Sequence, residues 1–157
     1  MPDQSPFGPL SGPVLVSACL LGVRCRYDGS SETCWSLLEI PGIIPVPVCP
    51  EQLGGLPTPR PPSHLVGGDG SAVINGAALV RDESGRDVTA AFRAGATEVC
   101  RIARMVHAEH AILKERSPSC GTHAVWRDGA LVAGCGVAAA MLKAQGVGVM
   151  NEDGTRG

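Results

Sequence analysis

The chain has 157 residues, a formal net charge of −2 and an aromatic content of 3%. With 44% hydrophobic residues, this length predicts one ordinary domain with a buried core. A net charge of this size gives no excess of basic residues for binding a nucleic-acid backbone. The scarcity of aromatic rings argues against a single-strand-binding protein that stacks bases on them. No apolar run reaches transmembrane length and no secretory signal is visible, so we expect a cytoplasmic protein without a membrane partner.

The first half of the chain predicts two strands separated by loops. Residues 1–12 are turn-rich and are expected to form a flexible leader before a single domain over residues 13–157. Apolar runs predict a strand buried on both faces over residues 13–19 and a second strand over 42–49, whose prolines make it irregular or place it near a sheet edge. The intervening and following segments are expected to be a short helix over 31–40 capped by Ser31, a long Pro/Gly-rich loop over 52–70, and an extended pair over 71–89.

The second half predicts alternating helices and strands. Apolar residues at helical spacing predict a helix over residues 90–109 with Thr89 as its N-cap. The further elements are a strand over 110–115, a turn-containing extended segment over 123–134, a helix over 136–146 and a strand over 147–153. This order predicts an α/β fold: a single three-layer Rossmann-like or flavodoxin-like domain with a mostly parallel sheet and an extra extended hairpin segment. The Gly-x-Gly-x-x-Gly fingerprint of a dinucleotide site is missing.

Cysteine is unusually abundant, with seven in the chain. In a reducing compartment, clustered thiols indicate metal binding or catalysis rather than disulfides. Cys19, Cys49 and Cys120 each lie in, or at the start of, the loop that leaves the carboxyl end of a predicted strand. Because such ends meet at the ligand-binding edge of an open α/β sheet, we expect the three thiols to lie close together. Three sulfur ligands suit an iron–sulfur cluster or zinc, and they leave one metal position open for catalysis.

Two oxygen-bearing side chains accompany these cysteines. Glu51 lies two residues after Cys49, and Ser117 opens the sequence SPSCG that contains Cys120. A carboxylate beside a metal centre could move protons, and a hydroxyl could orient a substrate. Taken alone, each has a simpler interpretation, as a solvated loop carboxylate and as a local turn cap.

Four motifs follow one another along the chain: SACLLGVRCRYDG, CPEQLGGLPTPRPP, GRDVTAAFRAGA and AILKERSPSCG. Together they resemble the family once called domain of unknown function 523 (DUF523), which is now associated with thiouracil desulfidases. The resemblance covers about residues 14–149 and implies a [4Fe-4S] enzyme that removes sulfur without net redox change. It also implies that Cys19, Cys49 and Cys120 hold the cluster with one open iron, and that Glu51 and Ser117 are catalytic.

The implied substrate is a small thiolated pyrimidine, 2- or 4-thiouracil, hydrolysed to uracil and hydrosulfide with the cluster as Lewis acid and sulfur acceptor. Relatives often carry a glutamate where this chain has His64, a difference that bears on substrate preference. The alternatives are a cluster-dependent desulfurase or hydro-lyase acting on another thio-compound, and a non-enzymatic iron–sulfur or zinc module that senses redox state.

Several further residues have alternative interpretations. Cys25 is either a fourth ligand that closes the cluster or a reactive thiol whose pKa is lowered by Arg24 and Arg26. Arg26 and Arg60 are candidate substrate contacts, although Arg60 suits a solvated loop charge equally well. The remaining cysteines are expected to be small buried hydrophobes: Cys34, Cys100 and Cys135.

Overall fold

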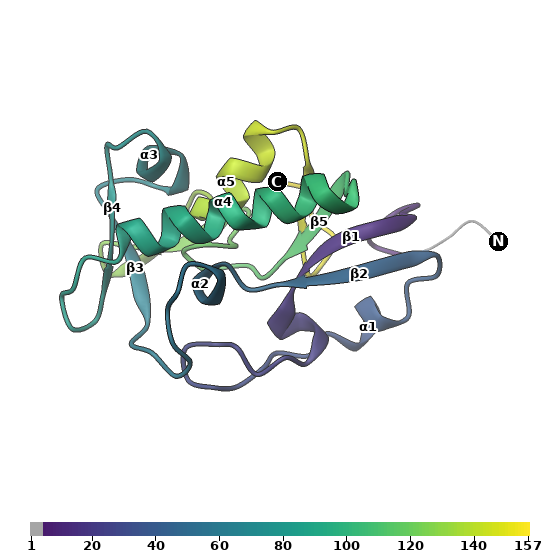
Figure 1. Ribbon diagram of the computed structural model, residues 1–157, viewed down its shortest axis with the longest axis horizontal. Helices are drawn as coiled ribbons and strands as arrows, with labels where there is room; N and C mark the ends of the chain where they lie inside the picture. Colours follow the sequence, from purple (N-terminus) through teal and green to yellow (C-terminus); the bar gives the residue numbers. More distant parts are fainter. Residues whose placement is uncertain (1–4) are drawn as a thin grey trace.

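Two four-stranded sheets organise the computed structural model, which describes residues 5–157 (Figure 1). Sheet A is parallel throughout and has the order β2 (Ile43–Val48), β1 (Gly12–Ser17), β5 (His110–Leu113), β8 (Gly148–Asn151). Sheet B is mixed and has the order β4 (Leu79–Asp82), β3 (Ser63–Val66), β6 (Ala124–Arg127), β7 (Ala130–Ala133). The predicted α/β class with a parallel sheet is confirmed, and the predicted hairpin is the β6–β7 pair at one edge of sheet B.

Sheet A is covered on both faces. The helices of the fold are η1 (Ala18–Leu21), α1 (Trp35–Leu38), α2 (Pro50–Leu53), α3 (Gly70–Ile74), α4 (Thr89–Val106) and α5 (Val137–Ala144). Leu15 of β1 packs in the cluster that contains buried residues of α4 and α5, whereas Val14 and Val16 pack with Leu37 of α1. The central strand is therefore buried on both faces, as its continuous apolar run predicts.

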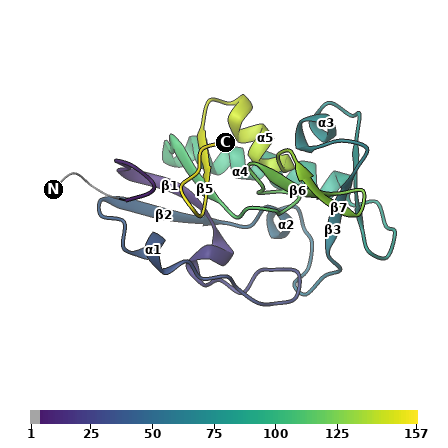
Figure 2. The ribbon, with the colours of Figure 1, turned by 180° about the vertical axis from the view of Figure 1, so that it is seen from behind.

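Helix α4 joins the two sheets into one body. Phe92 and Ala96 in its first half belong to the core beneath sheet B, while Val99 and Ala103 in its second half belong to the core of sheet A. Its predicted cap is different in the structure, because Val88 is the N-cap and the Thr89 hydroxyl accepts the backbone N–H of Val80 at 2.9 Å. Figure 2 shows the β6–β7 hairpin beside β3, on the far side of α4.

Three local predictions were wrong. The segment expected to be a loop over residues 52–70 contains the end of α2 and the whole of β3, which pairs with β4 and β6. The segment expected to be extended from residue 71 begins with α3, since the Asp69 carboxylate accepts the N–H groups of Ser71 and Ala72 and caps a helix. Helix α1 begins at Trp35 with Cys34 as N-cap, so Ser31 does not cap it.

The predicted leader lies partly outside the described residues, which begin at Ser5. Within it, Phe7 and Leu10 are buried in the cluster beneath sheet A. Among the described residues, no helix is long and apolar enough to cross a membrane.

Candidate active site

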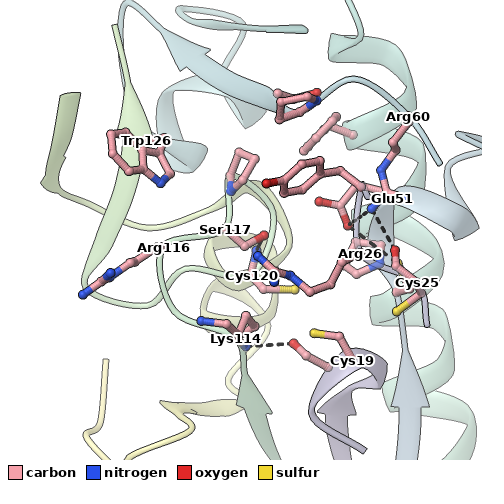
Figure 3. Close-up of a pocket in the computed structure, with 18 of the residues that line it drawn as sticks. Cys19, Cys25, Arg26, Glu51, Arg60, Lys114, Arg116, Ser117, Cys120 and Trp126 are labelled. Carbon is pink, nitrogen blue, oxygen red and sulfur yellow. Dashed lines mark hydrogen bonds and ion pairs between the residues drawn. The ribbon is translucent and has the colours of Figure 1, made fainter. Parts of the chain in front are cut away.

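Three adjacent strands of sheet A end at one cavity of about 710 Å³. Cys19 lies in η1 directly after β1, Cys49 follows β2 immediately, and Cys120 lies in the loop after β5. All three line the cavity. Figure 3 shows the side chains of Cys19, from η1, and Cys120, from the loop after β5. The structure thus brings together the three cysteines that were expected to converge.

A fourth thiol enters the same cavity from the loop after η1. Cys25 is buried, and its thiol is hydrogen bonded to those of Cys19 and Cys49. The bond to Cys19, together with burial and the charge of Glu51, raises the pKa of Cys25 to about 11, so the prediction of a lowered pKa was wrong. Arg26 does not favour the thiolate because its guanidinium is paired with Glu32 at 2.7 Å.

The thiols of Cys49 and Cys120 are also difficult to ionise. Burial, and then the nearby Glu51 carboxylate, raises the pKa of Cys120 to about 12. The pKa of Cys49 rises well above its usual value because its thiol is hydrogen bonded to Cys25 and is buried. Such thiols lose their protons when a cation compensates the charge, which is what metal binding does.

The donor set fits a cluster better than a single ion. Within residues 5–157, no group of three or more histidine, cysteine or acidic side chains is arranged to hold one metal ion. A zinc ion would need its ligand atoms within about 2.3 Å of a common point. Four thiols line the one cavity, and they offer the soft sulfur ligands that iron–sulfur clusters use.

Glu51 lies at the cavity wall on the short helix α2. Its Oε1 accepts the Ser119 hydroxyl at 2.8 Å, and its Oε2 is 3.8 Å from the Cys49 thiol and 4.0 Å from the Arg60 guanidinium. The side chain is only 13% exposed, so it is not the solvated loop carboxylate of the simpler interpretation.

Helix α2 lies directly against α4 through two glycines. A Cβ on Gly95 would lie 1.9 Å from the Pro50 carbonyl oxygen, and one on Gly54 would lie 2.0 Å from the Ala91 carbonyl oxygen. Side chains at either glycine would therefore separate the helices. This backbone contact fixes the position of Cys49 and Glu51 relative to α4.

Ser117 also lines the cavity, within a turn of the SPSCG loop (Figure 3). Its Oγ accepts the backbone N–H groups of Ser119 and Cys120 at 3.2 and 3.1 Å, and it lies 3.0 Å from the Ser119 Oγ. The serine therefore does cap a local turn, and the turn places its hydroxyl on the cavity.

Glu115 holds the SPSCG loop in place. Its carboxylate accepts the backbone N–H groups of Thr122, His123 and Ala124 at 2.8, 2.9 and 3.0 Å, together with the Asn151 side chain at 2.9 Å. Burial opposes ionisation of Glu115, but these hydrogen bonds outweigh it and hold its pKa well below the usual value. Glu115 precedes the loop that carries Ser117 and Cys120, and its carboxylate binds the backbone that follows the loop. It therefore holds both ends of the loop together.

The two candidate substrate arginines are occupied by protein groups. Arg60 donates to the Cys25 carbonyl at 3.0 Å and to the Pro57 carbonyl at 3.3 Å, and so holds the Cys25 loop. Arg26 pairs with Glu32, which also contacts Lys114 at 3.3 Å. Both arginines line the cavity, but their contacts shape its wall.

Sheet B supplies the outer rim of the cavity. His64 and Ser63 come from β3, and Trp126 comes from β6 with a side chain that is 45% exposed. His64, whose position departs from the resembling family, therefore does face the space where a substrate would lie.

The remaining three cysteines lie outside the cavity lining. Cys100 is buried in α4, and Cys135 is buried with its thiol 3.5 Å from the Asp69 carboxylate. Cys34 is only partly buried, at the start of α1. Cys100 and Cys135 match the expected small buried hydrophobes, and Cys34 does so in part.

A family model for 2-thiouracil desulfurase matches residues 14–154. The chain belongs to the 2-thiouracil desulfurase family. This family member is similar to the uncharacterized protein YbbK of Bacillus subtilis (strain 168), with 42% identity over 146 residues, 89% of this chain and 95% of that protein. It is also similar to the solved structure of the [4Fe-4S]-dependent thiouracil desulfidase TudS, with 38% identity, a TM-score of 0.75, and coverage of 91% of this chain and 92% of that chain.

Two residues of the site were missed in the sequence. Ser119 is fully buried between Ser117 and Glu51, and its only signal was its place inside SPSCG. Glu115 is the last residue of the predicted third strand, where acidic residues are common on surfaces. Its role depends on donors from residues 122–124 and 151, which no local pattern indicates.

Proposed function

We propose that this chain is a [4Fe-4S]-dependent thiouracil desulfidase, which hydrolyses 2- or 4-thiouracil to uracil and hydrosulfide. The observation that carries the proposal is the convergence of the three strand-end cysteines on one cavity that also receives Glu51 and Ser117. Family membership and the similarity to TudS support the same chemistry.

In this proposal Cys19, Cys49 and Cys120 hold the cluster. Hydrolysis at a metal centre needs a position open to the substrate, so three protein ligands suit the reaction better than four. Cys25 would then be a neutral thiol beside the cluster. The raised pKa of Cys25 agrees with a thiol that stays neutral, and the raised pKa of Cys120 agrees with a thiol that ionises only when the cluster compensates its charge.

When bound, the cluster would supply an open iron that polarises the thiocarbonyl group and accepts its sulfur. Glu51 would take a proton from the attacking water, because its carboxylate lies in the cavity wall beside Cys49. Ser117 would hydrogen bond to the pyrimidine and orient it. Two backbone N–H groups fix the Ser117 oxygen, so the protein itself sets the position of this hydroxyl.

The test begins with anaerobically purified protein. We expect about four irons per chain, a visible iron–sulfur absorption, and sulfide release from thiouracil. Cys19→Ser, Cys49→Ser and Cys120→Ser should each lose both iron and activity, whereas Cys34→Ser, outside the cavity lining, is the matched control. Bound zinc in place of iron, or an iron-loaded protein that releases no sulfide from either thiouracil, would contradict the proposal.

The two catalytic assignments are tested separately. Glu51→Ala and Ser117→Ala should retain iron while turnover falls by about 10²-fold or more, as expected for lost proton transfer or positioning. Full activity in Glu51→Ala would show that its assigned role is wrong.

Cys25→Ser distinguishes three ligands from four. The three-ligand proposal predicts unchanged iron content and retained turnover in this variant. Loss of iron to the extent seen in Cys120→Ser would make Cys25 a ligand as well.

A further inference from the structure

Aromatic side chains are scarce in this chain, yet three of the five line the cavity. Those three are Tyr27, Phe92 and Trp126. The other two lie elsewhere, Phe7 in the core beneath sheet A and Trp35 on the exposed side of α1. The cavity volume of about 710 Å³ lies within the usual range of small-molecule sites, roughly 300–1,000 Å³. The few rings of the protein are therefore concentrated where a small ligand would bind.

The three rings differ in how much of their surface is available to a ligand. Phe92 is only 1% exposed and belongs to the core beneath sheet B. Tyr27 is 40% exposed, but the Arg26 guanidinium lies over its ring at 5.6 Å. Trp126 is 45% exposed, and within residues 5–157 no cation lies over its ring and no hydrogen bond holds its indole N–H. Trp126 thus offers the most accessible aromatic surface of the cavity.

The alternation of strand β6 places this ring on the outer face of sheet B. Val125, the preceding residue, is 0% exposed and packs in the core beneath the sheet. Successive side chains of a strand point to opposite faces, so Trp126 points away from that core. Its partner across the hairpin is Leu131, which is 40% exposed and does not line the cavity.

Backbone contacts hold β6 against both ends of the SPSCG loop. At the start of the loop, the Arg116 N–H donates to the Ala124 carbonyl at 3.1 Å. At its end, a Cβ on Gly121 would lie 2.5 Å from the same carbonyl oxygen, so the two backbones are in direct contact. Figure 3 shows Trp126 and Ser117 among the residues of the cavity lining. The indole ring and the Ser117 hydroxyl are therefore fixed relative to each other.

We propose that Trp126 binds the pyrimidine ring of the substrate by stacking, an inference that rests on the proposed desulfidase function. A pyrimidine has a polar edge and two apolar faces. Hydrogen-bonding groups such as the Ser117 hydroxyl recognise the edge, and an aromatic side chain recognises a face. Every base has such a face, so the contact does not distinguish a thiocarbonyl from a carbonyl group. Trp126 therefore binds substrate and product alike.

An exposed tryptophan can instead belong to a protein-docking surface. Two further apolar side chains are exposed on sheet B, Leu79 at 37% and Leu131 at 40%. Neither lines the cavity, whereas Trp126 does. A docking role predicts that removal of the indole leaves pyrimidine binding unchanged, and that result would overturn our proposal.

Trp126→Ala in the anaerobically purified, iron-loaded protein is the central experiment. Loss of one stacking contact should raise the KM for thiouracil by about 5- to 150-fold. The kcat should stay within about threefold of wild type, because the lost contact is equal in the ground state and the transition state. The dissociation constant of uracil, measured by calorimetry, should rise by the same factor as KM. Trp126→Phe should retain most of both affinities, and a KM and uracil affinity that are unchanged in Trp126→Ala would overturn the proposal.

Leu131→Ala is the matched control for the integrity of the hairpin. It removes the residue paired with Trp126 but changes no side chain of the cavity lining. We expect wild-type iron content, KM and uracil affinity in this variant. If Leu131→Ala weakens uracil binding as much as Trp126→Ala does, the hairpin fold accounts for the effect and the stacking contact is wrong.

Fluorescence reports the contact directly, since the chain has two tryptophans. In the loaded Trp35→Phe variant, Trp126 is the remaining tryptophan, and saturation with uracil should change its emission. Trp126→Phe retains Trp35, which is 72% exposed and outside the cavity lining, so uracil should leave its emission unchanged. An unchanged emission in Trp35→Phe at a uracil concentration that calorimetry shows to be saturating would also overturn the proposal.

The outcomes separate this inference from the function on which it rests. If the loaded wild-type protein releases sulfide and Trp126→Ala equals it in KM and uracil affinity, stacking is wrong and the desulfidase proposal stands. If the wild type binds uracil through Trp126 but releases no sulfide from either thiouracil, the pyrimidine contact stands and the desulfidase proposal is wrong. A loaded protein that neither binds uracil nor releases sulfide would overturn both.

Discussion

Two loops form opposite walls of the cavity, and they are held by different kinds of interaction. The SPSCG loop is fixed by hydrogen bonds to the largely buried Glu115 carboxylate and by the start of α5. The loop that carries Cys25 is fixed at one side by Arg60, but its other side depends on Glu32, which pairs with Arg26 and Lys114 and is 43% exposed.

This contrast assigns different tasks to the two walls. Buried hydrogen bonds to a charge are worth more than exposed ion pairs, which salt screens and which contribute little to stability. The wall with Ser117 and Ser119 is therefore preorganised. The wall with Arg26 can adjust at small energetic cost, as a surface that surrounds a substrate can.

The largest effect should come from Glu115→Ala. The substitution leaves three backbone N–H groups and the Asn151 amide without their charged acceptor, so we expect the free energy of unfolding to fall by about 3–5 kcal/mol. Urea unfolding of the iron-free protein measures this change in the free energy of unfolding. Glu109→Ala, at an exposed position before β5, is the control, and equal small losses in both variants would remove the contrast between the walls.

Gly136→Ala should separate the SPSCG loop from α5. The new Cβ would lie 2.4 Å from the Ser119 carbonyl carbon, and we expect a loss of about 1–3 kcal/mol together with reduced kcat. Gly148→Ala is the matched control, because its Cβ would meet a movable His110 ring atom at 3.1 Å. Unfolding curves and turnover measured on both variants give the comparison, and a tolerated Gly136→Ala would mean that the loop can move freely.

The hydrogen-bonded Glu115 carboxylate should also make the free energy of unfolding depend on pH. Its folded pKa lies below its ordinary value of 4.5, so the stabilisation is fully present above about pH 4.5 and is lost as the pH falls below it. The difference in unfolding free energy between wild type and Glu115→Gln should therefore shrink in acid. His123, at 3.1 Å from the carboxylate, and Glu152, which accepts the Glu115 N–H, are the neighbouring titratable groups. A difference that stays constant from about pH 7 to pH 3 would contradict this role.

The smallest effect should come from Glu32→Gln. The ion pairs with Arg26 and Lys114 are partly exposed, so their loss should change the free energy of unfolding by at most about 1 kcal/mol. The remaining difference should diminish when unfolding is repeated at high salt. A loss as large as that of Glu115→Ala would show that both walls are equally rigid.

The sequence carried the information for the convergence of the thiols. Apolar runs identified the strands that precede Cys19, Cys49 and Cys120, and parallel strands necessarily end at one edge of a sheet. The β6–β7 hairpin and α5 were likewise visible, because the turn at Asp128–Gly129 and the stop at Gly146 are local signals.

What the sequence did not reveal depends on distant partners. Strand β3 lies within a Pro/Gly-rich stretch and forms through pairing with β4 and β6. Ser119 resembles any turn serine until α2 brings Glu51 to within 2.8 Å of it. In the sequence Arg60 resembles a solvated loop charge, whereas in the structure it donates a hydrogen bond to the Cys25 carbonyl. Each of these roles is created by tertiary contact.

Helix α4 links the chemistry of the site to its size. One end packs beneath sheet B, which carries the rim residues His64 and Trp126, and the helix also touches α2, which carries Glu51. The 18-residue helix thus acts as a spacer that sets the distance between the reacting centre and the cavity entrance. Substitutions at Phe92 or Ala96, which pack beneath sheet B, would therefore change the rim of the cavity while the side chains of Cys49 and Glu51 are retained.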